Sequence, residues 1–136
     1  MSLSHIEDNK DGEIIDNIFL RMGSYGAAMT NSFIFTDIIK SEHPEKTKMI
    51  TQIMTQQEKL IPVLVKLNII GFFRPIEWLN TRDQGRLMTI LLYYKQCPES
   101  VDKKVISCIH QKLSQKEVCN DLKPLIEIIE AKYNEQ

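Results

Sequence analysis

The segment TRDQGRLMTILLYYKQCP, residues 81–98, has the clearest helical pattern in the sequence. Its apolar residues recur three or four positions apart and line one helical face: Leu87, Ile90, Leu91 and Tyr94. Thr81 and Gln84 have the spacing of a capping box, in which two side chains and two amides at a helix start bond reciprocally. Pro98 ends the helix, because the residue before a proline is pushed out of the helical region. One well-delimited helix is therefore predicted.

The same spacing continues on both sides of this segment. Further apolar stripes at helical spacing cover residues 14–22, 33–39, 49–65, 101–113 and 122–133. Pro75 to Leu79 forms a short helical turn, and no stretch sustains the period of two expected of a half-buried strand. We therefore expect an all-α fold, a compact right-handed bundle or a short HEAT/armadillo-like stack of about six to eight helices.

Glycine, proline and capping residues predict where these helices stop and start. Gly23 to Gly26 interrupts the first stripe. Pro62 removes an amide donor inside the third stripe, so we expect a kink or a break near Ile61. Ser100 is a candidate N-cap for the next helix, and residues 114–117 repeat the capping-box spacing.

Length and polarity predict one domain. A chain of 136 residues is about one domain long, and 43% hydrophobic residues supply an ordinary core. Residues 1–12 are polar and are interpreted as a disordered lead-in or a non-native extension, so that the helical domain covers residues 13–136. The lead-in lacks the apolar core of a signal peptide. Leu60 to Phe73, the longest apolar stretch, is too short to span a bilayer.

Charge and cysteine usage exclude several classes of protein. With 17 basic and 18 acidic residues, the net charge of −1 gives no case for a dedicated nucleic-acid-backbone binder. Cys97, Cys108 and Cys119 are odd in number and form no CxxC motif, which favours buried thiols in the cytosol or nucleus. The histidines do not form a convergent ligand set, and no catalytic motif occurs. We expect no metal, no cofactor and no catalytic residue.

Large apolar side chains are more numerous than one buried face requires. In the connection IIGFFRPIEWL, residues 69–79, part must enter the core, and the rest would form an exposed patch of the kind that binds partners. We expect Trp78 in the core. Phe72 and Phe73 are each about equally expected in the core or in a groove that binds a partner. Residues 33–35 form a second cluster, in which one side chain is a candidate docking residue.

Three motifs follow one another between residues 57 and 115. A helical motif runs from Glu58 through Leu60 and Leu64 to Leu67, the dipeptide Gly85-Arg86 opens a hydrophobic helix, and YKQCPES, residues 94–100, closes it. In these motifs the stretch resembles the TFIIS N-terminal helical domain and, more closely, the core of the Iws/Spn transcription elongation factors. A looser likeness, through Asp37 and His43-Pro44, extends the resemblance over most of residues 13–115. Residues 116–136 would be an additional C-terminal helix.

The resemblance implies a non-catalytic adaptor in the nucleus that travels with elongating RNA polymerase II, and we expect it to be a monomer. It implies that the helical core binds an aromatic-containing N-terminal segment of the Spt-six histone chaperone. The expected partner-binding residues belong to the Gly-Arg helix and to one aromatic position before it: Arg86, Leu87, Ile90, Tyr94, Lys95 and Phe33. Such a set is chemically reasonable, because arginine can pair with a carboxylate or carbonyl at a groove rim and apolar neighbours can take an aromatic anchor.

Three other classes stay open. A Bcl-like or armadillo-like adaptor would bind an unrelated peptide, and the Bcl-like version would show a central helix apolar on all sides and cradled by six others. An enzyme of helical fold would show a deep polar cleft with converging titratable groups. Direct nucleic-acid binding would show in a gel shift that persists at physiological salt.

Overall fold

Helices make up the regular structure of this chain. The computed structural model describes residues 6–115 and 118–134, and no strand occurs in these ranges. The α-helices are α1 (Ile6–Lys40), α2 (Lys46–Lys66), α3 (Pro75–Leu79), α4 (Gln84–Gln96), α5 (Lys103–Ser114) and α6 (Lys123–Asn134). Short 3₁₀ turns precede α3, α5 and α6: η1 (Ile70–Phe73), η2 (Pro98–Ser100) and η3 (Asn120–Leu122). The predicted all-α class is confirmed.

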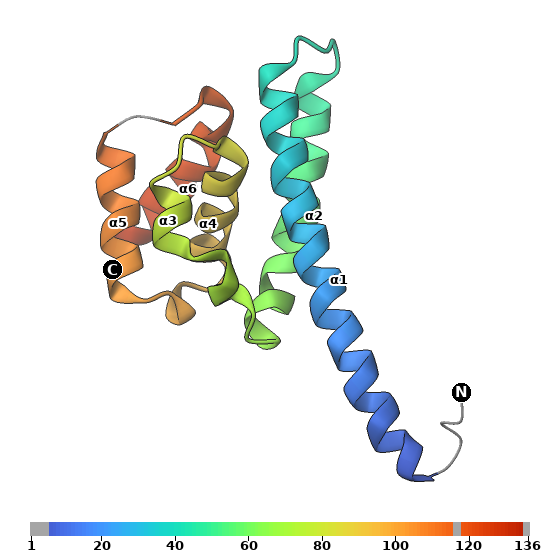
Figure 1. Ribbon diagram of the computed structural model, residues 1–136. Helices are drawn as coiled ribbons and strands as arrows, with labels where there is room; N and C mark the ends of the chain where they lie inside the picture. The colour runs from blue at the N-terminus through green and yellow to red at the C-terminus, as the bar shows by residue number, and fades with distance from the viewer. Residues whose placement is uncertain (1–5, 116–117, 135–136) are drawn as a thin grey trace.

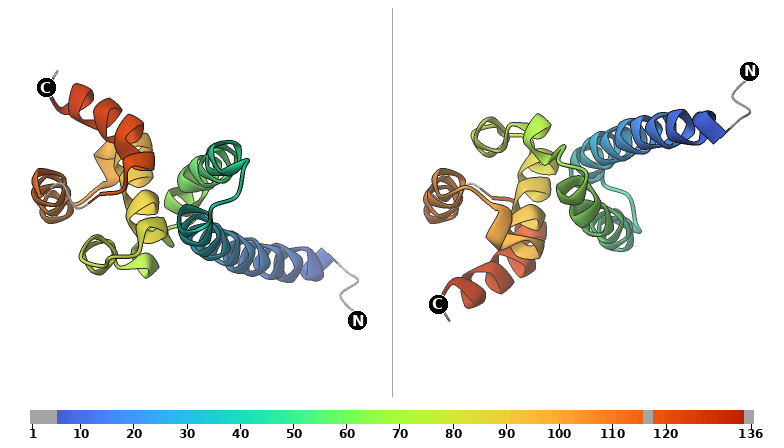
Figure 2. Two further views of the ribbon diagram at one scale, coloured as in Figure 1. Left: turned by 90° about the horizontal axis from the view of Figure 1, so that it is seen from above. Right: turned by 90° about the horizontal axis from the view of Figure 1, so that it is seen from below.

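The helices form two groups that meet at α4 (Figure 1). Helices α1 and α2 lie side by side as an antiparallel hairpin, and the first turns of α1 extend beyond the rest of the molecule (Figure 2). Helix α4 packs against α1, α2, α3 and α6. Because every residue from Leu87 to Tyr94 is buried, α4 is the centre of the core rather than an amphipathic surface helix.

Helix α1 continues through Gly23 and Gly26, so the predicted interruption is wrong. Its inner face is buried at helical spacing: Ser24, Ala28, Asn31, Ser32, Phe35 and Ile38. A glycine inside a helix costs only about 0.5–1 kcal/mol relative to alanine, which packing of this face against α2 and α4 offsets. Residues 6–12, predicted as part of the lead-in, are helical, whereas residues 1–5 lie outside the described residues.

Helix α2 runs through Pro62, so no break occurs near Ile61. Pro62 itself is exposed, while Ile61 and Leu64 beside it are fully buried. The burial of these two side chains holds the helix together where the proline lacks an amide donor.

Asp83 and Asp102, rather than Thr81 and Ser100, cap α4 and α5. The Asp83 carboxylate accepts a hydrogen bond from the third amide of α4 at 3.0 Å, and Asp102 accepts one from the second amide of α5 at 2.8 Å. Thr81 stabilises the turn before α4, where its hydroxyl accepts a hydrogen bond from the Asp83 amide at 3.2 Å. Ser114 ends α5, and its predicted capping box continues into residues 116 and 117, outside the described ranges.

One polar side chain joins three helices inside the core. Gln57 of α2 is fully buried, and its amide nitrogen donates to the Ala28 carbonyl at 3.0 Å and to the Thr89 hydroxyl at 2.8 Å. Its amide oxygen accepts from Asn31 Nδ2 at 3.0 Å. Because both donors and the acceptor of this amide are paired, the network fixes the register of α1, α2 and α4 without leaving Gln57 unsatisfied.

Candidate functional site

The residues expected to bind a partner lie in different environments. Leu87 and Ile90 are fully buried, and Tyr94 is 9% exposed. Phe33 on α1 is 49% exposed, and Arg86 is half-buried. Because Ile90 is enclosed by the core, Arg86, Ile90 and Phe33 do not form one exposed groove. Of these five, Phe33 and the outer part of Arg86 are the groups that a partner can reach in this conformation.

The structure explains why a glycine precedes Arg86. A Cβ atom at Gly85 would lie 1.8 Å from the Ser32 carbonyl oxygen and 2.7 Å from Thr36 Oγ1. The Thr36 hydroxyl accepts a hydrogen bond from the Gly85 amide at 3.0 Å and donates one to Asp83 Oδ1 at 2.7 Å. The first turn of α4 is therefore in direct backbone contact with α1.

The Arg86 side chain packs against the single tryptophan. Its guanidinium carbon is 5.4 Å from the centroid of the Trp78 ring, which is the geometry of a cation–π contact. Trp78 is 7% exposed, as its predicted place in the core requires. Within the described part of the chain, Arg86 Nε is buried and has no hydrogen-bond partner. The tryptophan ring therefore sets the position of this guanidinium.

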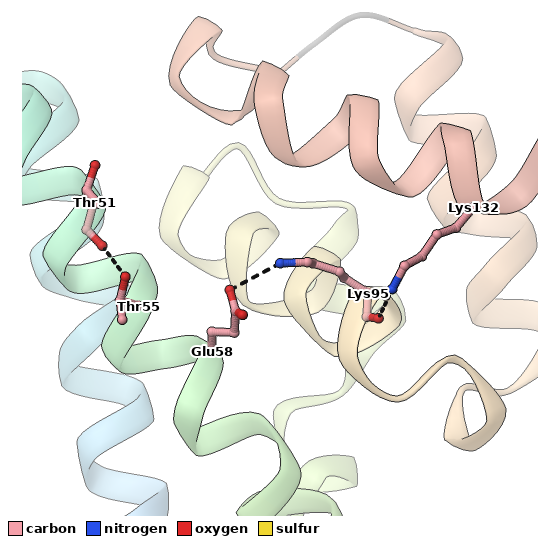
Figure 3. A network of polar contacts seen from close by, with 5 residues as sticks. All are labelled: Thr51, Thr55, Glu58, Lys95 and Lys132. Carbon is pink, nitrogen blue, oxygen red and sulfur yellow. Dashed lines mark hydrogen bonds and ion pairs between the residues drawn. The ribbon is translucent and has the colours of Figure 1, made fainter.

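Tyr94 and Lys95 both make contacts inside the molecule. The Tyr94 hydroxyl lies 3.3 Å from His110 Nε2, and the two rings meet edge to face. Lys95 Nζ lies 3.3 Å from Glu58 Oε2, and the Lys95 carbonyl accepts a hydrogen bond from Lys132 at 3.3 Å (Figure 3). These contacts tie α4 to α5, α2 and α6, so both residues contribute to the fold.

Burial shifts the pKa values of several groups around α4. Burial lowers the pKa of His110, and the charge of Glu130 opposes this shift. Burial raises the pKa of Tyr93 and of the Cys97 and Cys119 thiols. A raised thiol pKa favours the protonated form of the sulfur.

A row of aromatic rings leads from Arg86 to the surface. The Trp78 ring meets Phe73 edge-on, with 5.0 Å between centroids, and Phe73 stacks on Tyr25 at 5.0 Å and 29°. Phe73 is 1% exposed, whereas Tyr25 is 37% exposed. The row thus connects the first turn of α4 with the surface between α1 and η1.

At the outer end of this row lies an open hollow, which we call the Tyr25 groove. It has a volume of about 510 Å³ and is lined by Arg21, Met22, Tyr25, Ile69 and Phe72. Ile69 is 2% exposed and closes the hollow towards the core, whereas Phe72 is 68% exposed. Arg21 is held by the Leu67 carbonyl, which accepts from its guanidinium at 2.8 and 3.2 Å. The groove is therefore apolar, with a fixed cation at its edge.

Part of this groove could be predicted from the sequence. Phe72 and Phe73 were each about equally expected in the core or in a groove, and the structure places Phe73 in the core and Phe72 outside. Arg21 and Tyr25 were missed, because Tyr25 falls in the run interpreted as an interruption. Arg21 and Tyr25 are four residues apart, and Tyr25 is three residues before Ala28, so helical spacing could have placed all three on one side of a continuous helix.

A second hollow is more polar. It has a volume of about 430 Å³ and lies between α2 and the segment formed by η3 and α6. The hydroxyls of Thr51 and Thr55 on its α2 wall bond to the preceding turn of the helix, Thr55 Oγ1 to the Thr51 carbonyl at 2.8 Å (Figure 3). Because these hydroxyls are engaged within α2, the hollow offers a ligand fewer polar groups than its composition indicates.

Similarity to known proteins does not indicate a function for this chain. No family model, curated protein or solved structure matches the chain. Over residues 6–115 and 118–134, no helix combines the length and apolar character needed to cross a membrane. Within the same ranges, no group of three or more histidine, cysteine or acidic side chains is arranged to hold a metal ion.

Proposed function

We propose that the chain is a non-catalytic protein–protein interaction module of a transcription elongation factor. In this proposal it acts in the nucleus, associated with elongating RNA polymerase II, and binds an aromatic-containing N-terminal segment of the Spt-six histone chaperone. The partner and the compartment rest on the sequence resemblance. The docking role rests on an observation of the structure, the large apolar side chains left exposed on α1 and η1.

These exposed side chains carry the proposal. Phe19, Met22 and Phe72 are each more than three-fifths exposed, at 66%, 64% and 68%, and Phe33 is 49% exposed on the same long helix. Exposed large apolar side chains on neighbouring elements, as at Met22 and Phe72 of the Tyr25 groove, are typical of a site that a partner covers. A rigid helical scaffold is suited to the task, because its binding surface needs little reordering on association.

The expected docking residues contribute in two ways. Leu87 and Ile90 act indirectly, because their enclosed side chains hold α4 in place beneath the surface. Phe33 is open to direct contact, and Arg86 can offer the outer nitrogens of its guanidinium to a carboxylate or a carbonyl of the partner. Tyr94 and Lys95 keep α4 connected to its neighbours.

Calorimetry with the chaperone segment tests the proposal. We expect micromolar or tighter binding, lost on Arg86→Asp and weakened on Phe33→Ser, while circular dichroism shows both variants folded. Asp37→Ser is the matched control, since Asp37 is exposed one turn further along α1. An absence of binding heat for the unmodified chain would refute the proposed partner.

A Bcl-like adaptor is the second candidate, favoured by one observation. Helix α4 is buried along its whole central stretch, as the Bcl-like alternative requires. The helices that pack closely on it are α1, α2, α3 and α6 rather than six. Binding of an amphipathic helical peptide with no aromatic anchor, in place of the chaperone segment, would support this candidate.

A further inference from the structure

The Tyr25 groove is preformed. Asn68 turns the chain in the left-handed conformation, with φ 60°, directly after α2. The Ile69 amide then donates to the Leu64 carbonyl at 3.0 Å, and the Phe72 amide donates to the Ile69 carbonyl at 3.1 Å. With Tyr25 stacked on buried Phe73, the walls are anchored to the core. A ligand therefore meets a shaped surface and does not have to create one.

Its size and lining suit one bulky apolar side chain. A volume of about 510 Å³ lies within the range of about 300–1,000 Å³ typical of ligand sites. Tyr25 and Phe72 present ring surface, Met22 presents an adaptable thioether, and Ile69 closes the inner end. Aromatic or branched aliphatic anchors bind in such settings by stacking and by burial of apolar area.

The charge of the surroundings selects an acidic partner. Although the whole chain has a net charge of −1, Arg21 is charged and the other four residues that line the groove are uncharged. Two further basic residues, Lys66 and Arg74, are exposed and lie close in sequence to the lining residues Ile69 and Phe72. Arg74 forms an ion pair with exposed Glu77 at 3.4 Å, whereas the guanidinium of Arg21 bonds to a neutral carbonyl and, within the described residues, to no acidic side chain.

We propose that the Tyr25 groove binds an acidic peptide segment of a partner protein, with one bulky apolar side chain of the segment inserted between Tyr25 and Phe72. Arg21 pairs with a carboxylate next to that anchor, using the guanidinium N–H groups that are not bonded to the Leu67 carbonyl. Lys66 and Arg74 attract the acidic residues on either side. This inference rests on the proposed docking role but not on the identity of the chaperone.

A designed probe tests the site in the intact chain. The probe is a short peptide with one tryptophan in a run of aspartate and glutamate, and binding is followed by calorimetry. We expect alanine in place of its tryptophan to weaken binding about tenfold or more. Replacement of its acids by the corresponding amides should remove most of the salt dependence that opposite charges impose.

Protein variants locate the binding to the groove. Phe72→Ser and Arg21→Gln should each weaken probe binding roughly fivefold or more, through loss of ring contact and of charge pairing respectively. Ile128→Ser is the control, because Ile128 is an exposed apolar residue of α6 that does not line the groove. It should leave probe binding unchanged. Equal affinity in all three variants would overturn the proposal.

Two further outcomes separate this inference from its rivals. If sedimentation shows a dimer that Phe72→Ser dissociates, a second copy of the chain covers the groove and the acidic-peptide proposal is wrong. The chaperone segment is measured in parallel against the same variants. If the unmodified chain binds the probe but not the chaperone segment, the proposed elongation partner is wrong. If it binds the chaperone segment but not the probe, the groove assignment is wrong.

Discussion

Gly85 of α4 lies so close to the Ser32 carbonyl of α1 that a Cβ atom would approach the oxygen to 1.8 Å. Real Cβ atoms do not approach backbone oxygen this closely, so the two helices can keep this spacing only with glycine at position 85. The Thr36 hydroxyl, bonded to both the Gly85 amide and the Asp83 carboxylate, strengthens the same junction.

We expect Gly85→Ala to lower the free energy of unfolding by at least about 3 kcal/mol, because the new methyl group must push two backbones apart. The gain in helix propensity, about 1 kcal/mol, is too small to compensate. Gly26→Ala is the control, since a Cβ there would meet nothing within 4 Å, and it should stabilise the protein by about 0.5–1 kcal/mol. Urea denaturation of both variants measures the difference, and effects of the same sign would contradict the close approach of Gly85 to the Ser32 carbonyl.

We expect Gln57→Ala to destabilise the protein by about 2–4 kcal/mol. The substitution removes three buried hydrogen bonds and leaves the Asn31 amide and the Ala28 carbonyl without the partner they have now. Gln56→Ala, at the exposed neighbouring position of α2, should change stability by less than about 0.5 kcal/mol. Chemical denaturation of the pair provides the comparison, and similar values would show that the network contributes little.

Stability should fall as the solution is acidified through the histidine range. Burial lowers the pKa of His110 below its ordinary 6.5, so the unfolded chain binds the proton more readily than the folded one. The contribution of His110 is therefore complete above pH 6.5 and is lost as the pH falls through the folded-state pKa. Urea midpoints measured across this range should show the decline, and His110→Gln should reduce it. An unchanged slope in the variant would place the pH dependence elsewhere.

We expect Arg86→Ala to cost about 0.5–2 kcal/mol of stability and to change the fluorescence of Trp78. Trp78 is the only tryptophan of the chain, so its emission reports directly on the guanidinium 5.4 Å away. Arg82→Ala, at an exposed position before α4, is the matched control and should leave the emission unchanged. Identical spectra for Arg86→Ala and the unmodified chain would show that the contact is absent in solution.

Helical spacing alone was enough to predict the helical class and the start of α3 at Pro75. It failed at Gly23, Gly26 and Pro62, where local propensity argues for a break and the chain continues as helix. At each of these positions the inner face of the helix packs against neighbours that are distant in sequence, and this burial outweighs the local cost.

In the candidate site, too, the sequence indicates individual residues, whereas the packing of the helices decides their environment. Arg86 could be singled out from a dipeptide motif, but its contact with Trp78 depends on how α3 and α4 pack. Leu87 and Ile90 have the spacing of a docking face, yet the burial of α4 on every side encloses them. Nothing in the local pattern distinguishes an apolar stripe that faces a partner from one that faces the chain's own helices.

The sequence by itself determined that this protein is built of helices, because the helical repeat is a local property that apolar spacing records directly. Only the tertiary structure decided that Phe73 is buried while its neighbour Phe72 is exposed beside Arg21, since that outcome depends on α1 and η1 meeting across more than 40 residues of chain. Burial is a property of contacts between distant segments, and the energy that selects them is shared among all the helices that meet at α4.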